Sequence, residues 1–453
     1  MMGIGGIVNR FSDVWDRSRA WLARVFISRP FSRVLAGQVV SVTGSNATAV
    51  VIPLIAVITL DASSFEVGVL NAAESLAAAV LGIHIGRWCD CIGPDRTMLV
   101  SNLTGAVATI GLFAVLHAGV LSFPLLLALL LVVGLAELGF DISRTGYTVS
   151  LVPKDRLPHA NALIEGANAV GEGIGPSVGG WLFGTVGAAL SLLFDFVTYM
   201  CSSLLVLLNV LERRKRKMAA TAEYTPRQDE SPHDESDENG DGEVLSGLRF
   251  VWGNGIIRSI AFSAGQFNFF TAAFFTIYYV FVVRVLHMDP VAVGLAATCS
   301  GIGGIVSSVV AGTLIRRMAS GPLFIGTLLS PALAALLVPL SALEAEYGNA
   351  AVLALVCISQ FVWSFTVTVN LVLSESIKQV TTPERLLGQV SSVERVIALT
   401  AEPVGALAGG LFAEMIGEDI ALYLCAAGLA ASTAWALGGH GILSFRKPDE
   451  WQH

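Results

Sequence analysis

Twelve long apolar segments constrain the fold of this chain more than any other feature. They lie near residues 34–60, 65–87, 97–117, 121–146, 160–185, 188–211, 256–286, 291–315, 322–343, 350–377, 389–416 and 420–443. Each is long enough to cross a lipid bilayer as a helix, which takes about 20 residues rising about 1.5 Å each. Only 14% of the residues are charged, against roughly 25% in soluble domains, and the mean hydropathy is +0.70. The sequence therefore predicts an all-α membrane protein with 12 transmembrane helices.

Lys and Arg residues are distributed unevenly between the predicted loops. If the N-terminus is cytoplasmic, 26 of the 27 basic residues fall in cytoplasmic segments or at the cytoplasmic ends of spans, and only Arg284 lies near the outer face. Basic residues concentrate on the cytoplasmic side of membrane proteins. We therefore expect a multi-pass protein of the cell membrane with both its N- and C-termini in the cytoplasm.

The chain repeats itself. An offset of 230 residues places Pro153 on Pro383, Glu172 on Glu402, and the pair at 179–180 on the pair at 409–410. We expect two pseudo-symmetric six-helix bundles, which is the layout of carriers whose halves rock about a site between them. The predicted organisation is an amphipathic cytoplasmic segment at 1–30, bundles at 31–211 and 251–443, a disordered cytoplasmic linker at 212–250, and a cytoplasmic tail at 444–453.

Charge and motif content argue against several other classes of protein. Nine acidic residues between Glu223 and Glu243 account for most of the net charge of -8, so no basic surface for nucleic acid is expected. The six cysteines lack the paired spacing of a metal site. The histidines are isolated and no phosphate-binding loop is present. The sequence thus indicates neither an enzyme nor an ATP-driven pump, and we assign no metal, no cofactor and no obligate protein partner.

The loop after the second span carries a recognisable signature. Gly86, Asp90, Gly93 and Arg96 follow the spacing Gly-x-x-x-Asp-x-x-Gly-x-x-Arg, which resembles the cytoplasmic signature of the major facilitator superfamily. The resemblance implies that fold, and a cytoplasmic gate formed by these four residues. Cys91 departs from the pattern, because that position is usually basic.

A second signature lies on the fifth span. Its residues are Gly171, Gly175, Pro176, Gly179 and Gly180, and it is similar to a motif of exporting, proton-antiporting members of the superfamily. Small residues spaced in this way permit close helix contact, and the proline removes a backbone hydrogen bond. The resemblance implies export, and simple tight packing is the alternative reading.

Charged residues on the fourth span suggest a further part of the gate. Glu137, Asp141 and Arg144 are four and three residues apart, so they share one helix face. Because they lie toward the predicted cytoplasmic end, we expect them to join Asp90 and Arg96. The basic-x-x-Gln-Gly pattern of many proton-coupled members is absent here, so any coupling group must lie elsewhere.

Polar residues of the fifth span also share one face. Asn161, Glu165, Asn168 and Glu172 follow each other at spacings of four, three and four. Carboxyl groups inside a membrane are costly and usually face a wet cavity or the bundle interior. Low dielectric favours their protonated form, so we predict Glu172 as a proton- or cation-coupling group, with Glu402 and Glu74 as further candidates. The alternative is that each is a hydrogen-bonded structural residue.

Other polar and aromatic residues are expected around a central cavity, because the resemblance places spans one, seven and ten there. They are Gln38, Asn46, Gln266, Asn268, Gln360, Trp363 and Asn370. Together these features predict a secondary active transporter that exports a small amphiphilic or cationic molecule by alternating access, with protons and the substrate as its partners. Uptake by symport, and a non-transporting receptor or scaffold on the same fold, are the alternatives.

Overall fold

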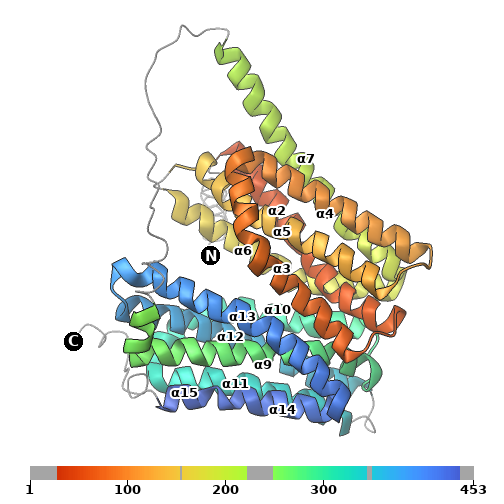
Figure 1. Cartoon of the computed structure of the whole chain (residues 1–453), viewed down its shortest axis with the longest axis vertical. Helices are drawn as coiled ribbons and strands as arrows, with labels where there is room; N and C mark the ends of the chain where they lie inside the picture. The colour runs from red at the N-terminus through yellow and green to blue at the C-terminus, as the bar shows by residue number, and fades with distance from the viewer. Residues whose placement is uncertain (1–27, 154–155, 222–247, 344–348, 439–453) are drawn as a thin grey trace, which may run out of the picture.

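The computed structural model describes residues 28–153, 156–221, 248–343 and 349–438 (Figure 1). The first half of the chain forms α2 (Arg29–Leu54) with a π-helical turn η1 (Ile55–Thr59), α3 (Ser64–Ile92), α4 (Pro94–His117), α5 (Phe123–Leu151), α6 (Leu157–Val186) and α7 (Ala188–Thr221). The second half forms α9 (Gly255–Arg284), α10 (Pro290–Arg317), α11 (Ser320–Ser341), α12 (Asn349–Thr381), α13 (Glu384–Ile416), α14 (Glu418–Ala431) and α15 (Thr433–Gly438). No strand occurs among these residues.

The helices are long enough and apolar enough to span a bilayer. Ten segments of the described residues meet both criteria, counting α14 with α15 as one and α2 with η1 as another. The helices α3 and α6 are not among the ten, although they have 29 and 30 residues. In α6 the glutamates and glycines of the polar stripe and the glycine motif dilute the apolar content. The predicted all-α membrane fold is confirmed, and the ten spans are consistent with the predicted twelve.

Local sequence sets where several helices begin and end. Ser63 and Glu66 form a reciprocal capping box at the start of α3, which satisfies two backbone N–H groups that the first turn leaves free. Gly187 and Gly417 occupy the sharp turns α6–α7 and α13–α14 with φ of 88° and 91°, a region that favours glycine. These two turns are 230 residues apart, so the repeat seen in the sequence extends to the backbone.

Some of the predicted segments lie outside the described residues or differ in extent. The amphipathic segment is described only at 28–30, and neither 222–247 within the linker nor the tail at 444–453 is described. The helix α7 continues to Thr221, ten residues past the expected end of the first bundle. Its extension begins with Glu212 and a run of Arg and Lys, which are good helix formers.

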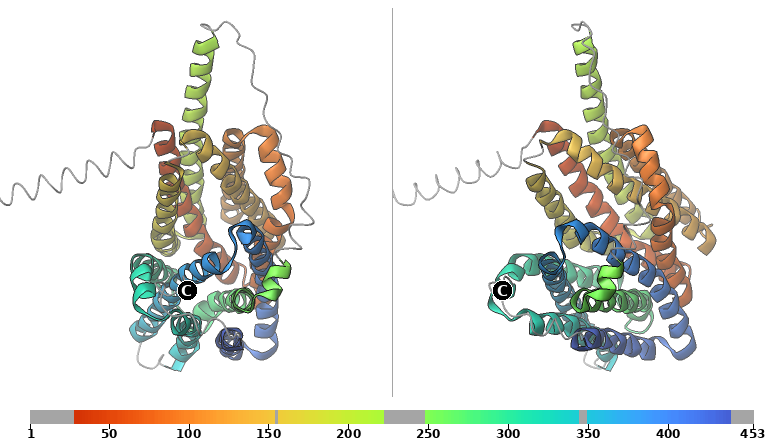
Figure 2. Two further views of the ribbon diagram at one scale, coloured as in Figure 1. Left: turned by 90° about the vertical axis from the view of Figure 1, so that its left-hand side faces the viewer. Right: turned by 60° about the vertical axis from the view of Figure 1, so that its left-hand side comes forward.

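The two bundles contact each other mainly at one end, which we call the closed end. The turns α2–α3, α6–α7, α9–α10 and α13–α14 lie there, and Figures 1 and 2 show the bundles diverging toward the opposite end. Arg284 donates to Asp61 Oδ1 at 2.7 Å and to the carbonyl of Ala62 at 2.9 Å. The backbone N–H of Phe65 donates to Glu414 at 3.2 Å. Polar contacts and packed apolar side chains from both halves therefore seal this end.

Helix backbones from the two halves also approach each other closely. A Cβ on Gly180 of α6 would lie 2.5 Å from the Cα of Gly294 on α10. A Cβ on Gly68 of α3 would lie 2.6 Å from the carbonyl of Ala406 on α13. Only glycine permits such distances. The cross-bundle interface thus depends on glycine at two independent helix crossings.

Candidate functional site

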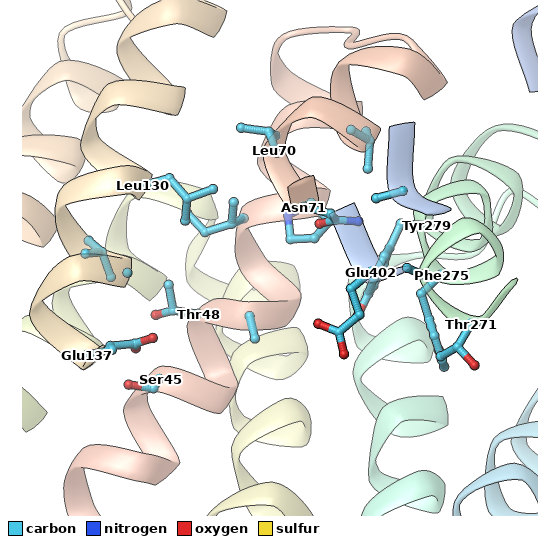
Figure 3. Close-up of a pocket in the computed structure, with 18 of the residues that line it drawn as sticks. Ser45, Thr48, Leu70, Asn71, Leu130, Glu137, Thr271, Phe275, Tyr279 and Glu402 are labelled. Atoms are coloured by element: carbon cyan, nitrogen blue, oxygen red, sulfur yellow. The ribbon is translucent and has the colours of Figure 1, made fainter. Parts of the chain in front are cut away.

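Two adjoining cavities lie between the bundles. One has a volume of about 440 Å³ and the other about 560 Å³. Both are lined by Ala49, Phe275 and Tyr279, so they form a continuous central site. Helices of both halves contribute to each cavity. Figure 3 shows Ser45, Thr48 and Glu137 from the first half on one side of the smaller cavity, opposite Thr271, Phe275 and Glu402 from the second.

The central site is acidic. Glu137 and Glu402 line the smaller cavity, and Glu165 and Glu172 line the larger one. Among the described residues that line these two cavities, none is Lys, Arg or His. Clefts lined by one sign of charge concentrate ligands of the opposite sign. The site is therefore suited to a cation, or to a molecule that carries a proton on an amine.

Aromatic rings form the apolar part of the site. Phe275 stacks edge-on against Trp363, with ring centroids 5.2 Å apart. Tyr278 and Tyr279 make a similar edge contact at 5.4 Å, and both line the larger cavity. Aromatic faces attract cations and bury much apolar surface. Aromatic and carboxylate groups together would fit an amphiphilic cation.

Glu172 lies where the larger central cavity meets a third cavity. That cavity, of about 240 Å³, lies inside the first bundle. Asn46, Asn168 and Glu172 line both of them. The Glu172 side chain is exposed to these spaces rather than packed in the protein core. Glu172 could therefore meet substrate on one side and the polar interior of the first bundle on the other.

The polar stripe of α6 is held by hydrogen bonds to α2. Gln38 Nε2 donates to Asn168 Oδ1 at 2.8 Å, and Asn168 Nδ2 donates to Glu165 Oε2 at 3.4 Å. Gln38 is buried, and its Oε1 has no partner within the described part of the chain. Asn161 is exposed and lines none of these three cavities. Three of the four predicted stripe residues thus reach a cavity.

Glu137 lies deeper than its predicted place in the gate. Its Oε1 accepts a hydrogen bond from Tyr199 Oη at 3.1 Å, and its side chain lines two cavities. Asp141 and Arg144 line only the third cavity and form an ion pair of 3.4 Å. Arg144 Nη1 is buried without a partner among the described residues. The three residues share a cavity inside the first bundle.

The loop signature after α3 is only partly visible. The side chains of Asp90 and of the coupling candidate Glu74 lie outside the described residues. Arg96 is exposed at the start of α4, and a Cβ on Gly86 would meet no atom within 4 Å. Gly93 adopts φ of 97° between α3 and α4, which explains a glycine at this turn. No hydrogen bond or ion pair joins Gly86, Gly93 or Arg96 to the described part of the second bundle.

The glycine motif of α6 has two faces. Gly171, Gly175 and Gly179 pack against the α2 backbone and side chains within the first bundle. Gly180 instead meets α10 of the second bundle, and Pro176 is buried within the helix. The motif therefore combines packing inside one bundle with contact between the bundles.

The candidates of the second half separate into different environments. Asn268 and Gln360 line the central cavities. Gln266 instead donates to the Gly428 carbonyl at 2.9 Å and accepts from Trp435 Nε1 at 2.7 Å, so it joins α9 to α14 and α15. Trp363 is buried and stacks on Phe274 at 5.1 Å.

A charged cluster in the second bundle was not singled out from the sequence. Lys378 is 5% exposed and contacts Glu375 at 2.6 Å and Glu394 at 2.8 Å. With Asn370 these residues line a fourth cavity of about 390 Å³. The sequence does contain a pattern that could have identified this cluster. Glu375 and Lys378 have the same acid-x-x-base spacing as Asp141 and Arg144 on the equivalent helix of the first half.

Known proteins resemble this chain over most of its length. The chain is 25% identical over 406 residues to the multidrug efflux pump Tap of Mycolicibacterium fortuitum, an alignment that covers 86% of this chain and 90% of Tap. The crystal structure of a bacterial homologue of the iron transporter ferroportin, in an inward-facing state, matches with a TM-score of 0.69 at 17% identity, over 91% of this chain and 99% of that one.

A second solved structure agrees on the fold. The bacterial homologue of the human lysosomal transporter Spinster, in an inward-facing and unoccupied conformation, matches with a TM-score of 0.61 at 15% identity, over 91% of this chain and 96% of that one. The family model described as Major Facilitator Superfamily matches residues 34–393. The chain is therefore a transporter that belongs to the major facilitator superfamily.

Proposed function

We propose that this transporter exports small amphiphilic or cationic molecules from the cytoplasm in exchange for protons. The observation that carries the proposal is the central site, which combines four glutamates with aromatic rings and lies between the bundles. Similarity to a multidrug efflux pump supports the direction of transport. So does the glycine motif on α6, which resembles that of exporting members.

The way in which the two bundles meet supports alternating access. The closed end is sealed by Arg284, Asp61 and the glycine crossings. The sequence predicts that the opposite end, which carries most of the basic residues, faces the cytoplasm of the cell. With that orientation the structure is open to the inside, which is the state in which an exporter loads its substrate.

Glu172 is our first candidate for the coupling group. A carboxyl on a water-accessible cavity can bind either a proton or a cation, and only one of them at a time. Binding of a cationic substrate would therefore release a proton, and reprotonation from the outer side would release the substrate. Glu402, across the central site, and Glu74 are candidates of lower rank.

Proton release from the purified protein tests this assignment. We expect cationic amphiphiles added to the detergent-solubilised transporter to release protons, and Glu172→Gln to abolish the release because the amide cannot titrate. Asp419→Asn is the matched control, since Asp419 is exposed at the start of α14, away from the central site. Substrate binding without proton release, unchanged in Glu172→Gln, would contradict Glu172 as the exchange group.

Direction is tested separately in inside-out membrane vesicles. An exporter oriented as predicted should accumulate a fluorescent cationic amphiphile in these vesicles when a proton gradient, acidic inside, is applied. Collapse of the gradient should stop the accumulation. Accumulation only in right-side-out vesicles would favour uptake by symport and overturn the proposed direction.

A further inference from the structure

Two cysteines from different helices meet in the second bundle. Cys299 lies on α10 and Cys357 on α12, and the two side chains are close enough to interact. Both residues are partly exposed, and both are free thiols. Cys89 and Cys91, in contrast, lie two residues apart on the last turn of α3.

The backbone fixes the position of this pair. The helices α10 and α12 both begin at the closed end, so they run parallel. Gly303 packs against the backbone carbonyl of Phe361 with no room for a Cβ. Cys299 and Cys357 each precede that contact by four residues, which is about one helical turn. This close helix crossing therefore places Cys299 and Cys357 side by side on neighbouring helices.

The pair also lies close to the central site. Ser300 and Gly301, which follow Cys299, line the larger cavity. Gln360, three residues after Cys357, lines it as well. A ligand that joined the two thiols would thus tie together two helices that form one wall of the cavity.

We propose that Cys299 and Cys357 form a dithiol site for a thiophilic ligand of the trivalent arsenical class. Two thiols are too few for tetrahedral zinc, which takes four ligands in structural sites and three in catalytic ones. A trivalent organoarsenical needs only two. An arsenoxide, R–As=O, forms two As–S bonds, and its oxygen leaves as water with the two thiol protons. No oxidant or reductant is consumed.

The full-length protein in detergent provides the test, with phenylarsine oxide as the probe. All variants carry Cys89→Ser and Cys91→Ser, because that close pair could also chelate arsenic. We expect one phenylarsenic group per chain, removed by a competing small dithiol. After trypsin cleaves at Arg316 and Arg317, the bound phenylarsenic group should still join the peptide that contains Cys299 to the peptide that contains Cys357.

Single substitutions identify the ligands. Cys299→Ser and Cys357→Ser should each abolish retention of the probe after washing, because one thiol gives only a labile adduct. Cys425→Ser, at a buried thiol elsewhere in the same bundle, should retain it. Matched gel-filtration profiles would show that the variants are folded. Retention of the probe in both single variants at the level of the parent protein would overturn the proposal. So would the absence of the cross-linked peptide from a protein whose thiols do react with a monofunctional maleimide. Binding itself does not depend on the proposed transport function.

Discussion

Individual charged residues in this protein differ in how completely they are paired. Lys378 is 5% exposed and held between two glutamates. Arg144 occupies a comparable place in the first bundle, but its contact with Asp141 is longer and one of its guanidinium nitrogens lacks a partner in the described structure. We interpret the cluster around Lys378 as a fixed structural element, and the Asp141–Arg144 pair as one that is free to rearrange.

Removal of the Lys378 charge should destabilise the second bundle. Lys378→Met would leave Glu394, 17% exposed, without its cation. Breaking a buried ion pair by removing one partner costs about 3 kcal/mol or more. We expect the free energy of unfolding, measured in denaturant titrations, to fall by about that amount. The double variant Lys378→Met, Glu394→Gln should recover part of the loss.

Arg395→Met is the control for this prediction. Arg395 lines the same cavity but is exposed, so its loss should change the free energy of unfolding by less than about 0.5 kcal/mol. If the double variant were as unstable as Lys378→Met alone, the unpaired carboxylate would not be the cause. Lost packing of the lysine stem would then be the better explanation.

At the scale of elements, α6 links the substrate site to the bundle interface. One face carries Glu165, Asn168 and Glu172, and other faces carry the glycines that contact α2 and α10. Movement of α10 relative to α6 would therefore change the cavity wall directly. The glycine contact at the closed end should then affect which end of the transporter is open.

A larger residue at this crossing should open the closed end. In Gly180→Ala, the new Cβ would meet the Gly294 backbone and the Pro290 carbonyl. We expect longer distances between spin labels at Val120 and Ile420, which are exposed near the closed end of the two bundles. Gly166→Ala on the same helix is the control, because its Cβ would meet nothing within 4 Å. Equal distance distributions in both variants would show that this crossing does not control the closed state.

Sequence periodicity was most informative where one helix face has one environment. It placed Glu165, Asn168 and Glu172 together because residues three and four apart share a face. It could not show which neighbour that face meets. Gln266 and Trp363 were assigned to a cavity, but one joins α9 to α14 and the other packs among aromatic rings. The rotation of a helix within a bundle depends on all its neighbours, which one sequence does not specify.

At the scale of the whole molecule, the sequence predicted two repeated bundles but not the end at which they contact each other. The repeat is visible because homologous positions keep their residues, as Glu172 and Glu402 do. Contacts between the bundles are harder to recognise in the sequence. Arg284 stood out only as the one basic residue near the predicted outer face, and the structure pairs it with Asp61 from the other bundle.

This cross-bundle pair should bias the transporter toward the observed state. Arg284 and Asp61 are 33% and 93% exposed, so their attraction is screened and worth at most about 1 kcal/mol. Such an energy changes the ratio of two conformations by about fivefold. Arg284→Gln should therefore raise, by up to about that factor, the fraction of molecules in which the bundles have separated at the closed end. The free energy of unfolding should change little. Spin labels at Val120 and Ile420 would measure the shift.

A charge swap separates the ion pair from other effects of the mutation. Arg284→Asp alone should open the closed end further, because two acidic groups would face each other. Adding Asp61→Arg should restore the original distribution, since the swapped charges attract equally well. The hydrogen bond from Arg284 to the Ala62 carbonyl cannot be restored by the swap. A double variant that remained as open as Arg284→Asp would show that this backbone contact, and not the ion pair, holds the two bundles together at the closed end.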